Sequence, residues 1–213
     1  MSLYRLKPRF QALLRPAAGA LHRFGVTANQ VTIAAAVGSL LIGGGLSAAA
    51  YFGRPGWFGL LPLWFLLRMA LNALDGMLAR EFGQSSALGA YLNELADVVS
   101  DAALYASFAF LPGAHPLAIA VLIFLSMLSE FAGVLGVAVS GRRRNDGPMG
   151  KSDRALVFGG LGLLVGVDAV PPAALFWLPY LVSLLVLVTI VSRVQRGLAE
   201  SAGVRRRPAD RRE

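Results

Sequence analysis

The sequence predicts an all-α integral membrane protein with six transmembrane helices and an N-terminal amphipathic helix on the membrane surface. Hydrophobic residues make up 56% of the 213 residues, charged residues make up only 15%, and the mean hydropathy is +0.61. Apolar runs of roughly 20 residues recur, which is the length of helix that crosses a bilayer core. This composition is too apolar for an ordinary soluble domain of the same length.

Composition also excludes several kinds of site. The chain has no cysteine, which rules out disulfides and thiolate chemistry, and His22 and His115 stand alone, which argues against a histidine zinc site. The net charge of +8 lies in short segments beside apolar runs, where it sets topology and attracts anionic lipids. We therefore expect the lipid bilayer, and not nucleic acid, as the partner of this charge.

Residues 1–30 form the first predicted segment. Basic side chains are interleaved with apolar ones at helix-like spacing, which favours an amphipathic surface helix over a disordered basic tail. The segment lacks the short apolar stretch and cleavage site of a signal peptide, so we expect it to be retained. Thr27 or Asn29 is expected to cap the helix that follows.

Six apolar segments follow in residues 31–196, the predicted membrane domain. In order they are about Val31–Ala50, Trp57–Leu78, Ala87–Leu111, Pro116–Val139, Ala155–Val170 and Ala174–Val194. Breaks at Pro55-Gly56, Pro112-Gly113 and Pro171-Pro172 separate several of them. Residues 197–213 are a basic C-terminal tail, expected to be disordered beyond Ser201.

The charge pattern supports six spans, although the fifth is short and rich in glycine. With six spans, the basic N-terminus, the Arg142–Arg144 run and the basic tail share one face, and only Arg54 lies opposite. Positive residues are enriched on the cytoplasmic side, so we predict that this face is cytoplasmic and that the protein lies in the inner membrane. We interpret the Arg142–Arg144 run as topological charge.

Polar side chains gather where the second and third spans are expected to meet as antiparallel neighbours. Asn72 and Asp75 are three residues apart and share a helix face, and Asn93 and Asp97 share one at a spacing of four. Ionisable groups inside a membrane indicate a functional site. Oxygen donors without histidine or cysteine favour a hard cation such as Mg²⁺ or Mn²⁺.

The same run of residues resembles the signature of the CDP-alcohol phosphatidyltransferases. In this chain it reads Asp75-Gly76-x-x-Ala79-Arg80, then Gly89 after eight intervening residues, then Asn93 and Asp97, each after three intervening residues. The six-span plan, the stretch VTANQVT and the stretch GKSDR are also similar to the family, so the resemblance covers most of the chain. Asn72 and Asn93 depart from it, because the family has aspartate at both positions.

The resemblance implies a homodimeric transferase that moves a phosphatidyl group from CDP-diacylglycerol, or a similar CDP-linked lipid, to a small hydroxyl acceptor and releases CMP. Its implied metal ligands are Asn72, Asp75, Asn93 and Asp97, with Asp97 also the general base. The implied binding residues for the CDP-linked lipid are Asp75, Gly76, Ala79, Arg80 and Gly89. With two charges lost, the site could bind two ions weakly, bind one, or be inactive; the carboxylates that remain favour activity.

Further charged residues lie near this site. Lys151 and Arg154, at the mouth of the fifth span, are predicted to bind the acceptor, for which glycerol 3-phosphate is the first candidate. Arg68 lies mid-span and is expected either to pair with Asp101 or Glu130 or to bind substrate. Two alternative functions stay open: a relative that binds CDP-lipid or metal without turnover, and a transporter whose charges line a path. The regular motif spacing argues against the transporter.

Overall fold

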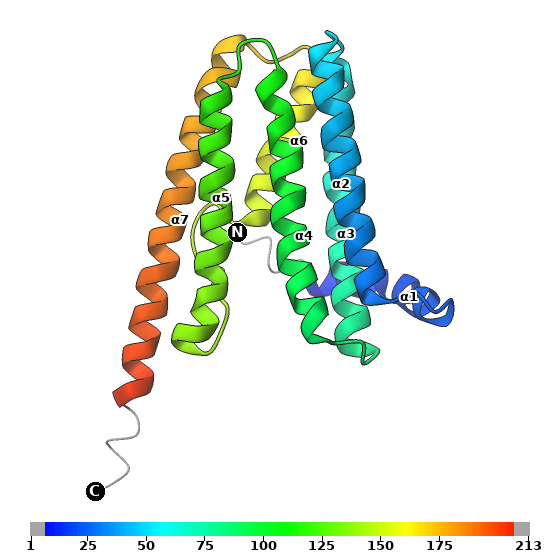
Figure 1. The fold of residues 1–213 in the computed structure, drawn as a ribbon, viewed down its shortest axis with the longest axis vertical. Coiled ribbons are helices and arrows are strands. Elements are labelled where there is room, and N and C mark those ends of the chain that lie inside the picture. Colours follow the sequence, from blue (N-terminus) through cyan, green and yellow to red (C-terminus); the bar gives the residue numbers. More distant parts are fainter. Residues whose placement is uncertain (1–6, 207–213) are drawn as a thin grey trace, which may run out of the picture.

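The computed structural model describes residues 7–206, and helix is the only regular secondary structure within that range, as predicted (Figure 1). The helices are α1 Lys7–Arg23, α2 Ala28–Tyr51, η2 Pro55–Leu60, α3 Leu61–Glu81, α4 Ala87–Ala106, η3 Ser107–Phe110, α5 Pro116–Ser140, α6 Lys151–Gly166 and α7 Pro172–Arg206. Residues 1–6 and 207–213 of the predicted terminal segments lie outside the described range.

Four segments of the described chain are long and apolar enough to cross a membrane. They are Ala28–Tyr51, Pro55–Glu81, Pro116–Ser140 and Ala173–Ala202. The other two predicted spans differ for physical reasons: α4 contains three carboxylates, Glu94, Asp97 and Asp101, and α6 has only 16 residues. At roughly 1.5 Å per residue, α6 is shorter than a bilayer core is thick. Six spans therefore stay a prediction.

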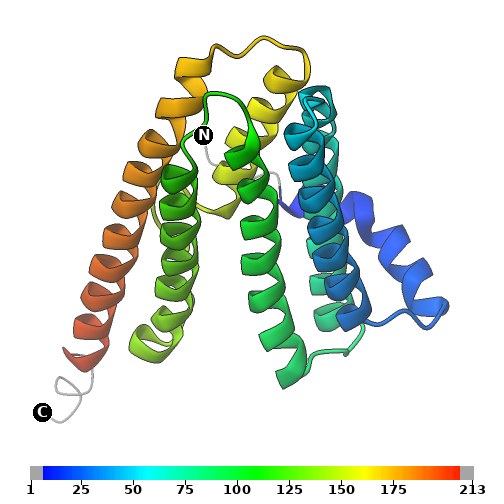
Figure 2. The same ribbon diagram turned by 45° about the horizontal axis from the view of Figure 1, so that its top comes forward.

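The long helices alternate in direction and α1 lies across one end of the bundle (Figures 1 and 2). The C-terminal end of α7, the α3–α4 connection and the loop of residues 141–150 lie at that same end. The turn with Arg54 lies at the other end, which follows the plan that the charge pattern predicted. Which end faces the cytoplasm stays a prediction.

Local signals explain how α1 and α2 begin. Thr27 caps α2, because its hydroxyl accepts from the Gln30 N–H at 3.2 Å while the Gln30 side chain accepts from the Thr27 N–H at 2.9 Å. The predicted N-terminal helix is present as α1, joined to the end of α3 by an ion pair between Arg15 and Glu81 at 3.1 Å. Its position on a membrane surface stays a prediction.

The second and third spans, predicted to be antiparallel neighbours, meet through their side chains. In the described chain α3 and α4 have almost no close backbone approach, and α2 packs against both of them. Gly43 of α2 makes that packing possible, because a Cβ there would lie 2.7 Å from the carbonyl carbon of Ala103 on α4. Side chains, not backbone packing, therefore connect α3 to α4.

The last helix is longer than predicted. α7 continues to Arg206, past the expected end at Val194, so the expectation of disorder beyond Ser201 is wrong as far as Arg206. Glu200 on this extension binds Arg142, at 2.8 Å, and Arg144 of the preceding loop. These ion pairs give the polar extension a partner in the folded protein.

Candidate active site

Asp97 on α4 is the point where three helices meet. Its Oδ1 accepts from Asn72 Nδ2 on α3 at 3.0 Å and from the Arg68 guanidinium, also on α3, at 3.3 Å. Its Oδ2 forms an ion pair with the Nζ of Lys151, the first residue of α6. The structure thus brings together four of the residues singled out from the sequence, although α3 and α4 do not pack directly.

The polar loop before α6 delivers Lys151 to this point. The loop of residues 141–150 turns back into the bundle after α5, and the Arg144 N–H donates to the Gly133 carbonyl on α5 at 3.0 Å. Met149 is buried, and its N–H donates to the Thr189 hydroxyl on α7 at 2.9 Å. The Gly150 N–H then donates to Asp153 at 3.0 Å, which satisfies a free donor at the start of α6.

Asp75 faces α2. It is 5% exposed, and its Oδ2 accepts from the Thr32 hydroxyl at 2.8 Å. Thr32 also donates to the Ala28 carbonyl at 3.1 Å, one turn earlier on α2. The sequence analysis did not single out Thr32, although it lies in the VTANQVT stretch. Among the described residues Asp75 and Asp97 share no common hydrogen-bond partner.

The glycines of the motif mark close approaches. A Cβ at Gly76 would lie 2.6 Å from a guanidinium nitrogen of Arg80, so the exposed Arg80 side chain lies over Gly76. A Cβ at Gly89 would lie 2.8 Å from Asn29 Oδ1, where the first turn of α4 approaches α2. Both glycines therefore leave space that any other residue would fill.

The remaining motif residues are half-buried. Ala79 packs in the small apolar cluster that joins α1 to α3. Asn93 lies on α4, four residues before Asp97 and so on the same face.

Arg154 lies deeper than the sequence indicated. Its side chain is fully buried, and it donates to Asp101 at 3.2 Å, to Glu130 at 3.1 Å and to the Met149 carbonyl at 3.3 Å. Arg68 also binds Asp101, which is one of the two partners expected for it. These contacts favour a positioning role for Arg154, and its predicted role in acceptor binding stays a prediction.

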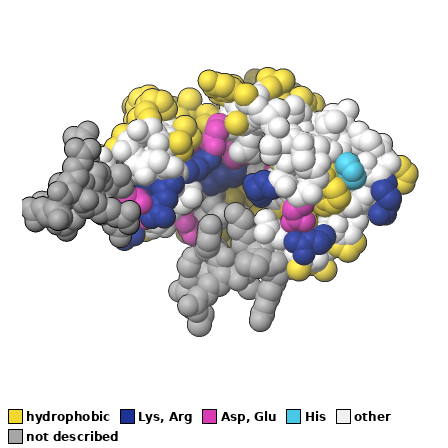
Figure 3. Space-filling view, turned by 90° about the horizontal axis from the view of Figure 1, so that it is seen from below, with side chains coloured by type: hydrophobic (Ala, Val, Ile, Leu, Met, Phe, Trp, Pro, Cys, Tyr) yellow, Lys and Arg dark blue, Asp and Glu magenta, His cyan; other side chains and the backbone are white. Residues whose placement is uncertain are grey.

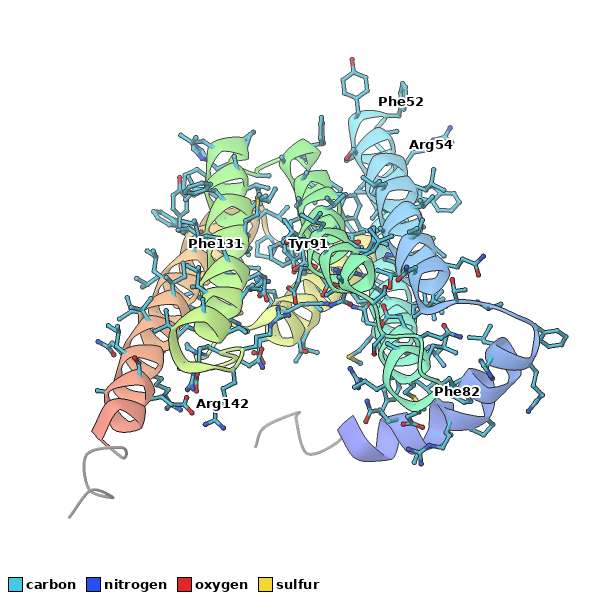
Figure 4. The ribbon with its side chains drawn as sticks, turned by 60° about the horizontal axis from the view of Figure 1, so that its bottom comes forward. Phe52, Arg54, Phe82, Tyr91, Phe131 and Arg142 are labelled. Carbon is cyan, nitrogen blue, oxygen red and sulfur yellow. The ribbon has the colours of Figure 1, made fainter. Side chains whose placement is uncertain are left out.

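Two further arginines belong to the same cluster. Arg143 binds Glu94 on α4 and, at 3.0 Å, Glu130 on α5. Arg193 on α7 lies 3.6 Å from Glu130. The sequence analysis missed both arginines. Arg193 could have been found, because it is a charged residue inside the last apolar span. Arg143 could not, because it lies in a run of three arginines that look alike in sequence. Its neighbour Arg142, labelled in Figure 4, has a 72% exposed side chain that pairs with Glu200 on α7.

Seen from the end where α1 lies, the molecule shows acidic and basic side chains gathered between the helices and apolar ones around the outside (Figure 3). Large apolar side chains such as Leu66, Phe131 and Leu184 are exposed on the flanks of the helices. A polar interior with an apolar outer surface is the arrangement that a lipid environment favours.

The predicted ligand set has the donor atoms of a site for a hard divalent ion. Asn72, Asp75, Asn93 and Asp97 offer only oxygen donors of the kind that Mg²⁺ and Mn²⁺ bind. Within residues 7–206, however, no group of three or more carboxylate, histidine or cysteine side chains converges. The two carboxylates of the set balance the charge of one divalent ion, and Lys151 already pairs with one of them.

The helical bundle and its motif define a known class of membrane protein. The sequence pattern of the CDP-alcohol phosphatidyltransferase family matches residues 25–192, so the chain belongs to that family. Its relatives include the inner membrane protein YnbA of Escherichia coli, 47% identical over 207 residues, or 96% of this chain and 100% of the relative. Archaetidylinositol phosphate synthase of Aeropyrum pernix is 28% identical over 157 residues, or 71% and 75% of the two chains.

Solved structures share the fold. Phosphatidylinositol phosphate synthase of Mycobacterium tuberculosis, in complex with manganese and citrate, matches with a TM-score of 0.68 over 85% of this chain and 87% of the other, at 24% identity. The same protein with CDP-DAG bound gives the same TM-score and identity and is covered to 92%.

Proposed function

We propose that this protein transfers a phosphatidyl group from CDP-diacylglycerol, or a similar CDP-linked lipid, to the hydroxyl group of an acceptor and releases CMP. Family membership supports the reaction class. The observation that carries the proposal is the position of Asp97, where Asn72, Arg68 and Lys151 converge on one carboxylate. The proposal includes an inner-membrane location, a cytoplasmic site and a homodimer.

The residues suit a displacement at phosphorus. Arg80 is exposed beside Gly76 and is free to bind a phosphate of the CDP-linked lipid through two N–H groups. Asp97 takes the proton of the acceptor hydroxyl. The acceptor oxygen then forms a bond to the lipid-side phosphorus, the bond between that phosphorus and the bridging oxygen breaks, and CMP leaves with the electron pair.

The proposal includes one Mg²⁺ or Mn²⁺ ion held by Asp75 and Asp97 with the amide oxygens of Asn72 and Asn93. Such an ion would neutralise part of the charge on the pyrophosphate. Thr32 holds Asp75 through its hydrogen bond, and Asn72 holds Asp97. Ala79 and Gly89 allow the helices around the nucleotide to approach closely.

The test is CMP release by the purified protein in liposomes that contain CDP-diacylglycerol. We expect release that requires Mn²⁺ or Mg²⁺ and an added acceptor, with one lipid product formed for each CMP. Tight CDP binding without CMP release would instead support the alternative of a binding protein. That alternative is favoured by one observation, the amides at two positions where the family has aspartates.

A further inference from the structure

One connected network of charged side chains fills the space between α3, α4, α5, α6, α7 and the loop of residues 141–150. Its five basic members are Arg68, Arg143, Lys151, Arg154 and Arg193, and its four acidic members are Glu94, Asp97, Asp101 and Glu130. Each basic member binds at least one carboxylate of the protein itself. We call this set the ion-pair network.

Glu130 on α5 is the centre of the network on the side away from α3. It is 6% exposed, its Oε2 accepts from Arg143 at 3.0 Å, and its Oε1 accepts from Arg154 at 3.1 Å. The same Oε1 lies 3.6 Å from Arg193. One carboxylate thus holds guanidinium groups from the loop, from α6 and from α7.

The other donors of these arginines are also used. Arg143 binds Glu94, the residue next to Asn93 of the motif. Arg193 donates to the carbonyl of Ser129 and, at 3.3 Å, to that of Asp146. The cations nearest the α4–α5 side of the site are therefore bound by the protein's own oxygen atoms.

Releasing these cations to a ligand would be costly. Arg154 is fully buried, and the cavity beside it, lined by Asp101, Tyr105, Ser126 and Glu130 among others, has room for about one water molecule. Removing a guanidinium from Glu130 leaves a carboxylate in the interior with its charge less compensated, which strongly destabilises a folded protein.

Arg80, on the α3 side of the site, differs from the network. It is exposed, and it has no carboxylate partner among the described residues. It lies over Gly76 in the motif proposed for the CDP-linked lipid. In the described site, Arg80 is therefore available to bind the phosphates of the donor, whereas the cations of the network form ion pairs within the protein.

We propose that the acceptor is a neutral alcohol or polyol without a phosphate group, because the four arginines of the ion-pair network are bound by Glu94, Asp101 and Glu130, carboxylates that the proposed mechanism does not use. This inference rests on the proposed function and replaces glycerol 3-phosphate, the acceptor first suggested by the charges of Lys151 and Arg154. It also differs from the phosphorylated products in the names of the relatives above.

Matched acceptors test this inference directly. The protein is placed in liposomes with CDP-diacylglycerol and Mn²⁺. Two matched pairs of acceptors are compared, glycerol with glycerol 3-phosphate and inositol with inositol 1-phosphate. CMP and the lipid product are measured for each acceptor. We expect turnover at least tenfold faster with an unphosphorylated member of a pair. Equal or faster turnover with the phosphorylated members would overturn the inference and leave the proposed function intact. No CMP release with any acceptor would reject both.

Variants of the network give a second readout that does not depend on turnover. Glu94→Gln and Glu130→Gln each remove a carboxylate partner of Arg143. Asp168→Asn is the control, because it also removes a carboxylate but Asp168 has no ion-pair partner among the described residues. Added inorganic phosphate should raise the melting temperature of Glu94→Gln or Glu130→Gln but not of wild type or Asp168→Asn. Glu94, half-exposed, keeps the test available if Glu130→Gln does not fold.

Phosphate binding by the wild-type protein would contradict the inference. If inorganic phosphate stabilises the wild-type protein and Arg143→Gln abolishes that effect, the network already contains an anion site and the inference is wrong.

Discussion

At the scale of single residues, the amides of Asn72 and Asn93 set the negative charge that the site presents to a bound cation. Asn72 donates a hydrogen bond to Asp97, which an aspartate at the same position could not do when ionised. Four carboxylates at these positions would repel one another strongly without metal, and replacing two of them with amides reduces that repulsion. The substitutions therefore fit a site that needs less cationic charge.

Restoring the missing carboxylates should strengthen metal binding. We expect the Asn72→Asp/Asn93→Asp double variant to bind Mn²⁺ at least about tenfold more tightly, since two charges are added to an oxygen-donor site. Electron paramagnetic resonance of free Mn²⁺ during titration gives the affinity and the number of ions bound. Asn145→Asp, on an exposed loop residue, is the control. Equal affinities in the double variant and wild type would contradict the proposed ligand set.

Arg68 should matter for stability far more than an exposed arginine. It is 3% exposed and binds both Asp97 and Asp101, so Arg68→Met should lower the free energy of unfolding by about 3–5 kcal/mol. Arg15→Gln removes an exposed pair with Glu81 and should cost less than about 1 kcal/mol. Unfolding by dodecyl sulfate in mixed micelles measures both, and equal losses would show that the buried pairs do not stabilise the bundle.

At the scale of helices, glycines allow α6 to pack closely against η2. A Cβ at Gly166 would lie 2.6 Å from the Cα of Gly59, and a Cβ at Gly162 would lie 2.9 Å from the Phe58 carbonyl. These neighbours are backbone atoms, which cannot turn aside. Glycines four residues apart allow helices in membranes to approach closely in this way.

Alanine at these glycines should therefore separate α6 from η2. We expect Gly166→Ala and Gly162→Ala each to lower the free energy of unfolding by about 1–3 kcal/mol, the usual cost of overpacking. Gly160→Ala is the matched control on the same helix, because nothing lies within 4 Å of a Cβ there. A loss as large in the control would mean that helix propensity or lipid contact, and not the approach of η2, explains the effect.

Much of this arrangement was predictable from the sequence, and the exceptions have a common cause. The helix positions, the cap at Thr27 and the pairing of Arg68 with Asp101 follow from periodicity, local hydrogen bonding and the cost of a buried charge. The re-entry of the loop before α6 and the packing of α2 against both α3 and α4 depend on contacts between distant segments. No local pattern encodes such contacts.

The same limit applies to the site. Spacing predicted which faces of α3 and α4 carry Asn72, Asp75, Asn93 and Asp97. It could not predict that Thr32 would hold Asp75, or that Arg143 would lie between Glu94 and Glu130. A sequence gives the charge of Arg143 but not its partners, so topological charge and a structural ion pair look the same there.

At the scale of the whole molecule, orientation in the membrane follows from charge. The basic loop and α1 lie at one end of the bundle (Figure 1) and Arg54 lies at the other (Figure 4). The absence of cysteine from the chain allows a clean test with single cysteines. In intact cells a membrane-impermeant maleimide should label Arg54→Cys, and should label Arg142→Cys only after the inner membrane is opened. The reverse pattern would place the site on the outer face.

The central claim is that Asp97, held by α3 and α6, is the base of a CDP-lipid transferase. The most direct measurement compares CMP release by wild type, Asp97→Asn and Asp168→Asn in liposomes with CDP-diacylglycerol, Mn²⁺ and a neutral acceptor. Asp168 is the control because it lies at the far end of α6, with a positive φ of 54° that asparagine also tolerates. We predict a loss of about 10²–10⁴-fold for Asp97→Asn and little change for Asp168→Asn. Undiminished CMP release by a folded Asp97→Asn variant would contradict the account.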